Sequence, residues 1–435
     1  MHVHFIGIGG IGVSSLAKYL LLKGFFVSGS DILLSAQVNE LEKLGAVICG
    51  NNESEYIHNA DVIVVTSAIK SSNESLCLAK KLCKPIYKRS QLLKLISLCY
   101  KLSVGIAGSH GKTTATAMLT SILDSKGINF VSFIGGNDNR FGNFYYKNNS
   151  KIMLSEVCEY DKNIYDFNAG IGVVLNVDND HLDTYKNMQN LTRAFYDYLD
   201  RAQVRIVCND DNILKDYSGS KITYAIENDA NYTAKNLHQK SGRYSFDLCF
   251  NGKKLFKVYL SVYGKHNVLN ALCAIAVAKQ LKVSNNHIVE GLKNFNGVGR
   301  RFENLGKIGE VKILADYCHH PTEIKCTLET LKELYNGDYL IIFEPHTYSR
   351  TKLLFKDIIS VFSGEKPIIY KTFSAREKYS YLGSGSYLAK KIKGATYIKS
   401  VDNLLEIIKN TNVSNVVILG AGSLYSKIKS KINNS

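Results

Sequence analysis

A glycine-rich segment with one lysine and two threonines carries the strongest chemical signal in the sequence. It follows an apolar run at residues 103–107, precedes a helical pattern at 113–125, and reads Gly108-Ser109-His110-Gly111-Lys112-Thr113-Thr114. A loop between a strand and a helix offers backbone amides, an ammonium and a hydroxyl to the phosphates of a nucleotide and its Mg²⁺. Ile106 stands where the first glycine of the usual G-x-x-x-x-G-K-[ST] loop would be. We therefore expect a nucleotide site whose turn depends on Gly108 and Gly111.

Side chains that could complete a metal site follow two further strand candidates. Glu156 comes just after an apolar run at 152–154, and the pair Asp180-His181 follows a strand candidate at 172–177. The ends of parallel strands converge on a ligand crevice, and phosphate-bound Mg²⁺ prefers oxygen ligands. We expect Glu156 to bind the metal. A single Glu or His would more often be structural, but two such positions beside a nucleotide loop favour function.

A second glycine motif lies at the N-terminus, and its sequence is Gly7-Ile8-Gly9-Gly10-Ile11-Gly12. It fits G-x-G-x-x-G between a strand and a helix, and Asp31 follows the next strand candidate about 20 residues later. An acidic residue there can hold a ribose hydroxyl, so a nicotinamide-dependent dehydrogenase is the first rival hypothesis. A tight strand-to-helix turn without a ligand is the structural alternative.

Four later motifs also gather polar residues. Asn267 and Asn270 share one face of an Ala-rich helix and could contact an adenine, although capping of that helix by Asn267 is the alternative. The other three motifs, which solvated loops would equally explain, are residues 299–303, 316–321 and 344–350. The last two hold two of only four prolines in the chain. Ordinary loops do not usually show that concentration.

Strand and helix patterns alternate along most of the chain, which predicts α/β domains. A first unit covers residues 1–100, a second begins near residue 101, and a third begins near residue 297. Short alternating segments between residues 218 and 262 predict antiparallel hairpins attached to the second unit. We expect domains at 1–100, 101–296 and 297–435.

Composition excludes several classes of protein. The chain has 435 residues and 45% hydrophobic residues, too many for one core and too apolar for disorder. No run is apolar enough to span a membrane, and nothing at the N-terminus marks a secretion signal, so we expect a cytoplasmic protein. The net charge of +16 is spread along the chain without a dense basic tract, which disfavours nucleic-acid binding. The ten cysteines contain no C-x-x-C pair, which favours neither zinc nor disulfides.

The order of these motifs resembles the Mur ligase family, and most closely its alanine-adding branch, from Phe5 to Gly422. The segments that carry the resemblance are residues 7–12, 107–114, 180–185, 266–270, 299–302, 316–323 and 344–346. The resemblance implies an N-terminal Rossmann-like domain for a UDP-sugar, a central P-loop-type ATPase with a parallel sheet plus a small antiparallel sheet, and a C-terminal Rossmann-like domain for an amino acid. The first glycine motif then becomes a UDP site.

The resemblance also implies an activity in peptidoglycan precursor synthesis. ATP would phosphorylate the lactyl carboxylate of UDP-N-acetylmuramate, and the amine of L-alanine would then attack the acyl phosphate. The closest alternative is the recycling ligase that attaches a whole tripeptide to the same UDP-sugar. The sequence leaves the oligomeric state open.

Residue roles follow from the same resemblance. The catalytic residues would be Lys112, Glu156, His181, His319 and Arg350. The ligands of Mg²⁺ would be Thr113, Glu156 and His181. ATP would bind at 108–114, Asn267, Asn270, Arg301 and Asp316. The UDP-sugar would bind at Gly9, Gly10, Ile11, Gly12 and Asp31, and the amino acid at Tyr317, His319, His346 and Arg350.

The sequence departs from close relatives at a few positions. Cys158 stands where an acidic residue is usual, Cys318 where a small residue is usual, and Thr347 where an Arg is often found. The amino-acid carboxylate would therefore depend on Arg350. Residues 191–199 contain no lysine, so a carbamylated lysine is not expected. We expect alkylation of Cys318 to inhibit, with a buried, inert thiol as the alternative.

Overall fold

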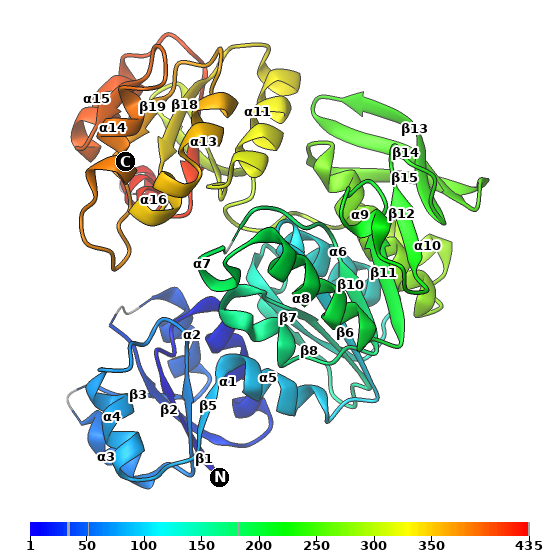
Figure 1. Ribbon diagram of the computed structural model, residues 1–435, viewed down its shortest axis with the longest axis vertical. Helices are drawn as coiled ribbons and strands as arrows, with labels where there is room; N and C mark the ends of the chain where they lie inside the picture. Colours follow the sequence, from blue (N-terminus) through cyan, green and yellow to red (C-terminus); the bar gives the residue numbers. More distant parts are fainter. Residues whose placement is uncertain (33–34, 51, 181, 434–435) are drawn as a thin grey trace. The chain divides into compact units, whose positions relative to one another are not determined.

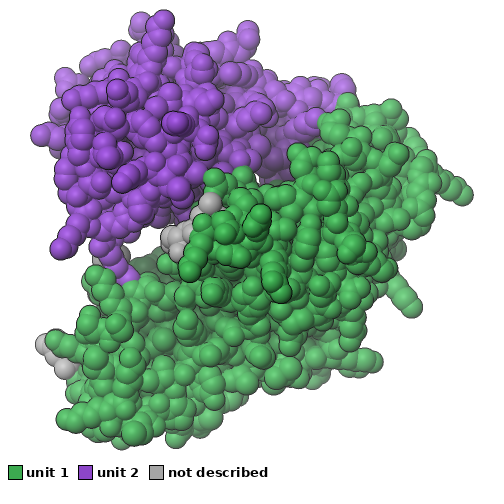
Figure 2. All heavy atoms as spheres, in the orientation of Figure 1, with its two compact units in different colours: residues 1–237, 246–261, 268–296 green, residues 238–245, 262–267, 297–435 purple. Residues whose placement is uncertain are grey.

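The computed structural model describes residues 1–32, 35–50, 52–180 and 182–433 (Figure 1). Strands and helices alternate and form three β-sheets, which confirms the expected α/β class. The chain divides into two compact units, the first made of residues 1–237, 246–261 and 268–296 and the second of 238–245, 262–267 and 297–435 (Figure 2). Among the described helices, none combines the length and the apolar character that crossing a bilayer would require.

The first sheet has the strand order β3-β2-β1-β4-β5, and all its neighbouring strands are parallel. Its central strand β1 is buried along its whole length, as expected for a parallel sheet covered on both faces. The order reverses between β1 and β4, so a ligand crevice is expected at the carboxyl end of β1. The strands are β1 (His2–Ile6), β2 (Phe26–Ser30), β3 (Val47–Ile48), β4 (Val62–Val65) and β5 (Ile86–Lys88). The helices are α1 (Ile11–Leu22), α2 (Ala36–Lys43), α3 (Glu53–Asn59), α4 (Glu74–Lys81) and α5 (Arg89–Ser97).

The second sheet has ten strands in the order β15-β14-β13-β12-β11-β10-β6-β9-β7-β8. Strands β10 and β9 pair with β6 in parallel on its two sides, so the three strands end at one edge of the sheet. The segments expected to form hairpins are β13 to β15, which extend this same sheet beyond β12.

The strands of the second sheet are β6 (Leu102–Ala107), β7 (Phe130–Asp138), β8 (Gly142–Tyr146), β9 (Ile152–Glu156), β10 (Ile171–Val174), β11 (Val204–Cys208), β12 (Ile222–Ala225), β13 (Tyr232–Lys240), β14 (Arg243–Phe250) and β15 (Lys253–Tyr263). The helices are α6 (Lys112–Ser125), α7 (Leu182–Tyr185), α8 (Met188–Asp200), α9 (His266–Gln280) and α10 (Asn285–Lys293), with short 3₁₀ turns at η1 (Tyr160–Tyr165) and η2 (Leu214–Asp216). Strand β10 ends three residues before the predicted end at Val177, because the chain there turns toward the glycine-rich loop.

The third sheet lies in the second unit and has the order β16-β17-β21-β18-β19-β20. Strand β16 is antiparallel to β17, and the other pairs are parallel. The strands are β16 (Glu303–Ile308), β17 (Val311–Asp316), β18 (Leu340–Glu344), β19 (Ile368–Tyr370), β20 (Thr396–Ile398) and β21 (Asn415–Gly420). The helices are α11 (Pro321–Tyr335), α12 (Tyr348–Leu353), α13 (Phe355–Val361), α14 (Gly385–Ala389), α15 (Val401–Lys409) and α16 (Leu424–Asn433), with a 3₁₀ turn at η3 (Tyr381–Gly383).

Candidate active site

The glycine-rich loop joins the buried strand β6 to helix α6, as its sequence predicts. Gly111 caps the helix with a φ of +84°, a left-handed conformation that a residue with a side chain rarely adopts. A Cβ at this position would also come within 2.5 Å of Asn270 Oδ1. Both the positive φ and the lack of space for a Cβ therefore require glycine at position 111. The side chain of Asn270 in α9 lies directly against this residue.

Lys112 points its ammonium back into the loop rather than into solvent. Its Nζ lies 2.9 Å from both carboxylate oxygens of Glu159 and donates to the carbonyl oxygens of Gly108 and Ser109. Burial lowers the pKa of Lys112, but the acidic groups around it, Glu159 foremost, together outweigh burial and raise that pKa. The ammonium is thus kept protonated at the point where a nucleotide's phosphates would bind.

Glu156 and Thr113 meet at the edge of the sheet where β6 and β9 end. Thr113 Oγ1 donates to Glu156 Oε2 at 3.2 Å, and the other carboxylate oxygen of Glu156 accepts from the backbone N–H of Gly135. A hydroxyl and a carboxylate beside a phosphate loop are the oxygen ligands that suit Mg²⁺. The two residues therefore fit a magnesium ion. The third predicted ligand, His181, lies outside the described residues.

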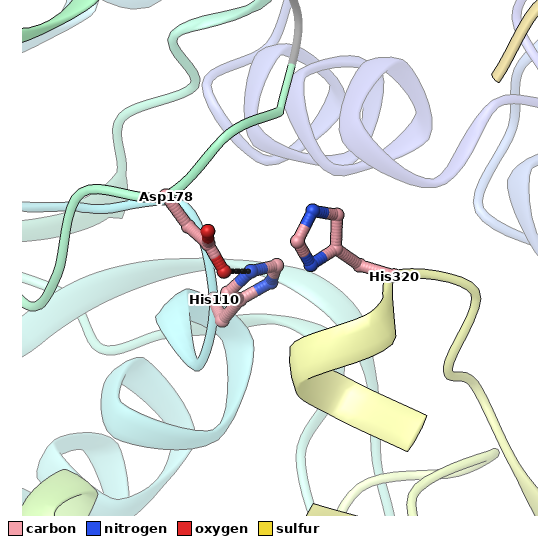
Figure 3. A group of neighbouring side chains, drawn as sticks. All are labelled: His110, Asp178 and His320. Atoms are coloured by element: carbon pink, nitrogen blue, oxygen red, sulfur yellow. Dashed lines mark hydrogen bonds and ion pairs between the residues drawn. The ribbon is translucent and has the colours of Figure 1, made fainter. Parts of the chain in front are cut away.

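The segment after β10 holds the glycine-rich loop in place. The side chain of Asn176 accepts from the backbone N–H of His110 at 2.8 Å and donates to the carbonyl oxygen of the same residue at 3.1 Å. Nε2 of His110 lies 2.9 Å from Asp178 Oδ2, and Figure 3 shows the imidazole ring directed at that carboxylate. Ser109 Oγ accepts from the backbone N–H of Asp178. The loop is consequently fixed before any nucleotide binds.

Two charged side chains lie beside the N-terminal glycine turn. Asp31 Oδ2 accepts from the backbone N–H of Gly9 at 2.8 Å, and a Cβ at Gly9 would come within 2.9 Å of that oxygen. On α1, a Cβ at Gly12 would come within 3.1 Å of the guanidinium of Arg89. Gly10 is the N-cap of α1, with Ile11 as its first residue. The side chain of Asp31 thus stabilises the turn by a hydrogen bond with the backbone of Gly9.

Three residues predicted to bind ATP lie in the second unit. Arg301 donates to the carbonyl oxygen of Tyr317 at 2.8 Å and lies 3.5 Å from Glu323. Asp316 is the last residue of β17, accepts from Thr327 Oγ1 at 2.5 Å, and has its pKa raised by burial. Asn267 is the second residue of α9, and its side chain donates to the carbonyl oxygen of Tyr263 at 2.7 Å.

The residues predicted to bind the amino acid gather at the carboxyl ends of β17 and β18. The His319 ring lies 5.6 Å from the Tyr317 ring and 5.4 Å from the His346 ring, measured between centroids. The backbone N–H of Arg350 in α12 donates to Thr347 Oγ1 at 3.4 Å, a capping bond at the start of that helix. Three of the four predicted side chains therefore form one cluster.

Local structure explains two other features of this region. His320 caps α11 by accepting from the backbone N–H of Thr322, and Pro321 occupies the first turn, where its missing N–H costs nothing. The thiol of Cys318 is only 1% exposed, and burial raises its pKa well above the ordinary value. This burial favours the alternative of a buried, inert thiol, and the expectation that alkylation of Cys318 inhibits stays a prediction.

Sequence reasoning missed Glu159 and Asn176 as parts of the site. Glu159 stands three residues after Glu156, but nothing in the sequence shows that its carboxylate turns to Lys112. Asn176 belongs to a motif that the sequence singles out. Its position just past the end of β10 could have indicated that it lies beside the glycine-rich loop. Arg89 had no sequence signal.

Comparison with known proteins identifies the family of the chain. Three family models match the chain: Mur ligase family, catalytic domain, at residues 2–100; Mur ligase middle domain at 106–278; and Mur ligase, glutamate ligase domain, at 300–424. The UDP-N-acetylmuramate–L-alanine ligase of Clostridium beijerinckii is 38% identical, over 97% of this chain and 95% of the relative.

Two crystal structures share the fold. The UDP-N-acetylmuramate–alanine ligase of Thermotoga maritima has a TM-score of 0.85 at 24% identity, covering 100% of this chain and 98% of that chain. A murein peptide ligase of Psychrobacter arcticus has a TM-score of 0.77 at 22% identity, covering 100% and 99%. Since the family models together match most of the chain, it belongs to the Mur ligase family of ATP-dependent ligases.

Proposed function

We propose that this protein joins L-alanine to the lactyl carboxylate of UDP-N-acetylmuramate in an ATP-dependent reaction of peptidoglycan precursor synthesis. The names of relatives at 38% identity over nearly the whole chain support this substrate pair. The single structural observation that carries the proposal is the placement of Lys112, Thr113 and Glu156 at one edge of the second sheet. That arrangement suits phosphoryl transfer from a nucleotide.

The reaction divides into two steps. The γ-phosphoryl group of ATP passes to the lactyl carboxylate, and the amine of alanine then displaces phosphate from the acyl phosphate as the amide bond forms. Lys112 would neutralise charge on the transferring group, and the amides of 108–114 would hold the other phosphates. Thr113 and Glu156 would hold Mg²⁺, with His181 as the predicted third ligand. When bound, the ion would polarise phosphate oxygens.

Substrate sites follow from the three proposed domains, 1–100, 101–296 and 297–435. The turn from Gly9 to Gly12 would bind the UDP diphosphate at the start of α1, where free backbone N–H groups favour an anion. The cluster of Tyr317, His319 and His346, together with Arg350, would bind alanine. A guanidinium can form two parallel hydrogen bonds with a carboxylate, which suits Arg350 for that part of alanine.

Phosphate release tests the proposal directly. The protein is incubated with ATP, Mg²⁺ and UDP-N-acetylmuramate, and alanine or the tripeptide L-alanyl-γ-D-glutamyl-diaminopimelate is added separately. We expect release that depends on the UDP-sugar and is fastest with alanine. Preference for the tripeptide would replace the proposed amine substrate. No release with either amine, while added NAD(P)⁺ is reduced, would support an oxidoreductase instead.

A further inference from the structure

Lys112 and Glu159 form a buried ion pair inside the proposed nucleotide site. The Lys112 side chain is 15% exposed and the Glu159 side chain 1%, and both carboxylate oxygens lie 2.9 Å from the ammonium. Ion pairs at this depth are much less screened by solvent than pairs on the surface. The Glu159 charge therefore acts strongly on Lys112.

The backbone around Glu159 is held independently of Lys112. Its carbonyl oxygen accepts from the hydroxyl of the buried Tyr185 at 2.6 Å and from the backbone N–H of Lys162 at 3.1 Å. The residue also lies only three positions after the end of β9. The anchored backbone therefore keeps the Glu159 carboxylate within reach of the ammonium, while the side chain itself can rotate without breaking these bonds.

The described residues already supply an acceptor for each donor of the Lys112 ammonium. A lysine ammonium has three N–H donors, and here Glu159 and the carbonyl oxygens of Gly108 and Ser109 supply the acceptors. A phosphate oxygen must therefore displace one of these acceptors to reach Lys112. It must also approach a site that already contains the carboxylates of Glu156 and Glu159.

We propose that Glu159 is an internal counter-ion that competes with the nucleotide's phosphates for Lys112 and so limits the affinity for ATP. This inference rests on the proposed function, in which the loop at 108–114 binds ATP.

The direction in which Glu159→Gln changes the affinity for ATP distinguishes a counter-ion from a merely structural residue. Glu159→Gln removes the charge but keeps the size of the side chain, so Lys112 loses its ionic partner in the free protein. A bound phosphate then restores an anionic partner. Because a ligand that binds the folded state more strongly stabilises it more, the variant should be less stable alone but gain more stability from ATP. A side chain with a merely structural role would weaken nucleotide binding or leave it unchanged.

Isothermal titration calorimetry with Mg²⁺ tests the inference on the full-length protein. We expect Glu159→Gln to bind ATP and ADP at least about fivefold more tightly than the wild type, within the usual range of coupling between two sites. Adenosine, which lacks phosphates, should bind both proteins equally. Asp161→Asn is the matched control, since Asp161 lies in the same segment but pairs with Lys88. Its affinity for ATP should equal that of the wild type.

Each outcome separates the inference from the function on which it rests. Failure of the wild type to bind ATP would overturn the proposed function. A wild type that binds ATP, combined with equal or weaker binding by Glu159→Gln, would overturn the counter-ion role alone. If Glu159→Gln does not fold, Glu159→Asp is tested in its place. The shorter side chain keeps the negative charge but holds it farther from Lys112. That variant should bind ATP more tightly by a smaller factor, and unchanged or weaker binding would again overturn the role.

Discussion

The side-chain amide of Asn143 in β8 donates to the carbonyl oxygen of Ile11 in α1 at 2.7 Å. The same amide donates to Ser14 Oγ, and its oxygen accepts from Nζ of the buried Lys18 at 2.7 Å. A single residue of the second sheet thus fixes the first turn of the helix that follows the N-terminal glycine turn. These hydrogen bonds connect the proposed UDP site to the proposed ATPase sheet.

Replacement of Asn143 should affect both stability and UDP-sugar binding. Asn143→Ala leaves the carbonyl of Ile11 and the ammonium of Lys18 without this partner, at a cost of about 1–3 kcal/mol in the free energy of unfolding. Urea denaturation measures that loss. We also expect a higher KM for the UDP-sugar and little change in the affinity for ATP. Asn148→Ala, on the surface after β8, is the control. An equal rise in the KM for the UDP-sugar and in the dissociation constant of ATP would show that Asn143 does not act specifically through α1.

Glu156→Gln should abolish most turnover while leaving UDP binding intact. The variant keeps the size of the side chain but removes the charge beside Thr113, so it should weaken the proposed Mg²⁺ site. We expect kcat to fall by more than about tenfold, which corresponds to about 1.4 kcal/mol of transition-state stabilisation. Steady-state rates over a Mg²⁺ titration measure the effect, and UDP affinity serves as the internal control. A kcat above a tenth of the wild-type value would contradict the metal assignment.

Arg350→Lys should raise the KM for alanine strongly with little change in the affinity for ATP. A lysine keeps the charge but cannot reproduce the planar pair of hydrogen bonds to a carboxylate. Initial rates at varied alanine measure the change, and Lys352→Gln on the exposed face of the same helix is the control. Glycine and serine should be slow substrates, within roughly two orders of magnitude of alanine in kcat/KM. A normal KM for alanine would assign the carboxylate to another cation, such as Arg376.

Glu53 should make the stability of the protein depend on pH. Burial by itself raises the pKa of Glu53, but hydrogen bonds from His4, Ser30 and Ser75 outweigh it and hold that pKa below its ordinary value. A carboxyl with a depressed pKa stabilises the fold above its unfolded pKa, and that contribution is lost as the pH falls. Glu53→Gln should therefore reduce the free energy of unfolding near pH 7 by about 1–3 kcal/mol.

The difference between Glu53→Gln and the wild type should shrink below about pH 4, where the carboxyl of the unfolded chain is already protonated. Urea denaturation at several pH values provides the measurement. Glu55→Gln on the exposed side of α3 is the control and should behave like the wild type. A difference that stays constant as the pH falls from 7 to well below about 4 would show that packing, not charge, explains the effect.

Residue pattern and spacing are enough to predict the α/β class and the elements on which the site is built. The glycine-rich loop had to join a strand to a helix, because β6 is a short apolar run, α6 has helical spacing, and only glycine tolerates the conformation of Gly111. Glu156 was expected at the end of a strand, because an apolar run at 152–154 precedes it. These relations depend on residue type and local spacing, which the sequence contains.

Tertiary structure alone decided which side chains meet. Glu159 pairs with Lys112 across 47 positions of the chain, and Asn143 reaches Ile11 across 132. Such contacts depend on how sheets and loops pack, and hydrophobic periodicity carries no information about the partner of a buried polar group. Cys318 shows the same limit: its place beside two site residues suggested reactivity, whereas the structure buries the thiol within the core of the third sheet. Burial is a property of the packed molecule, so only the structure could decide it.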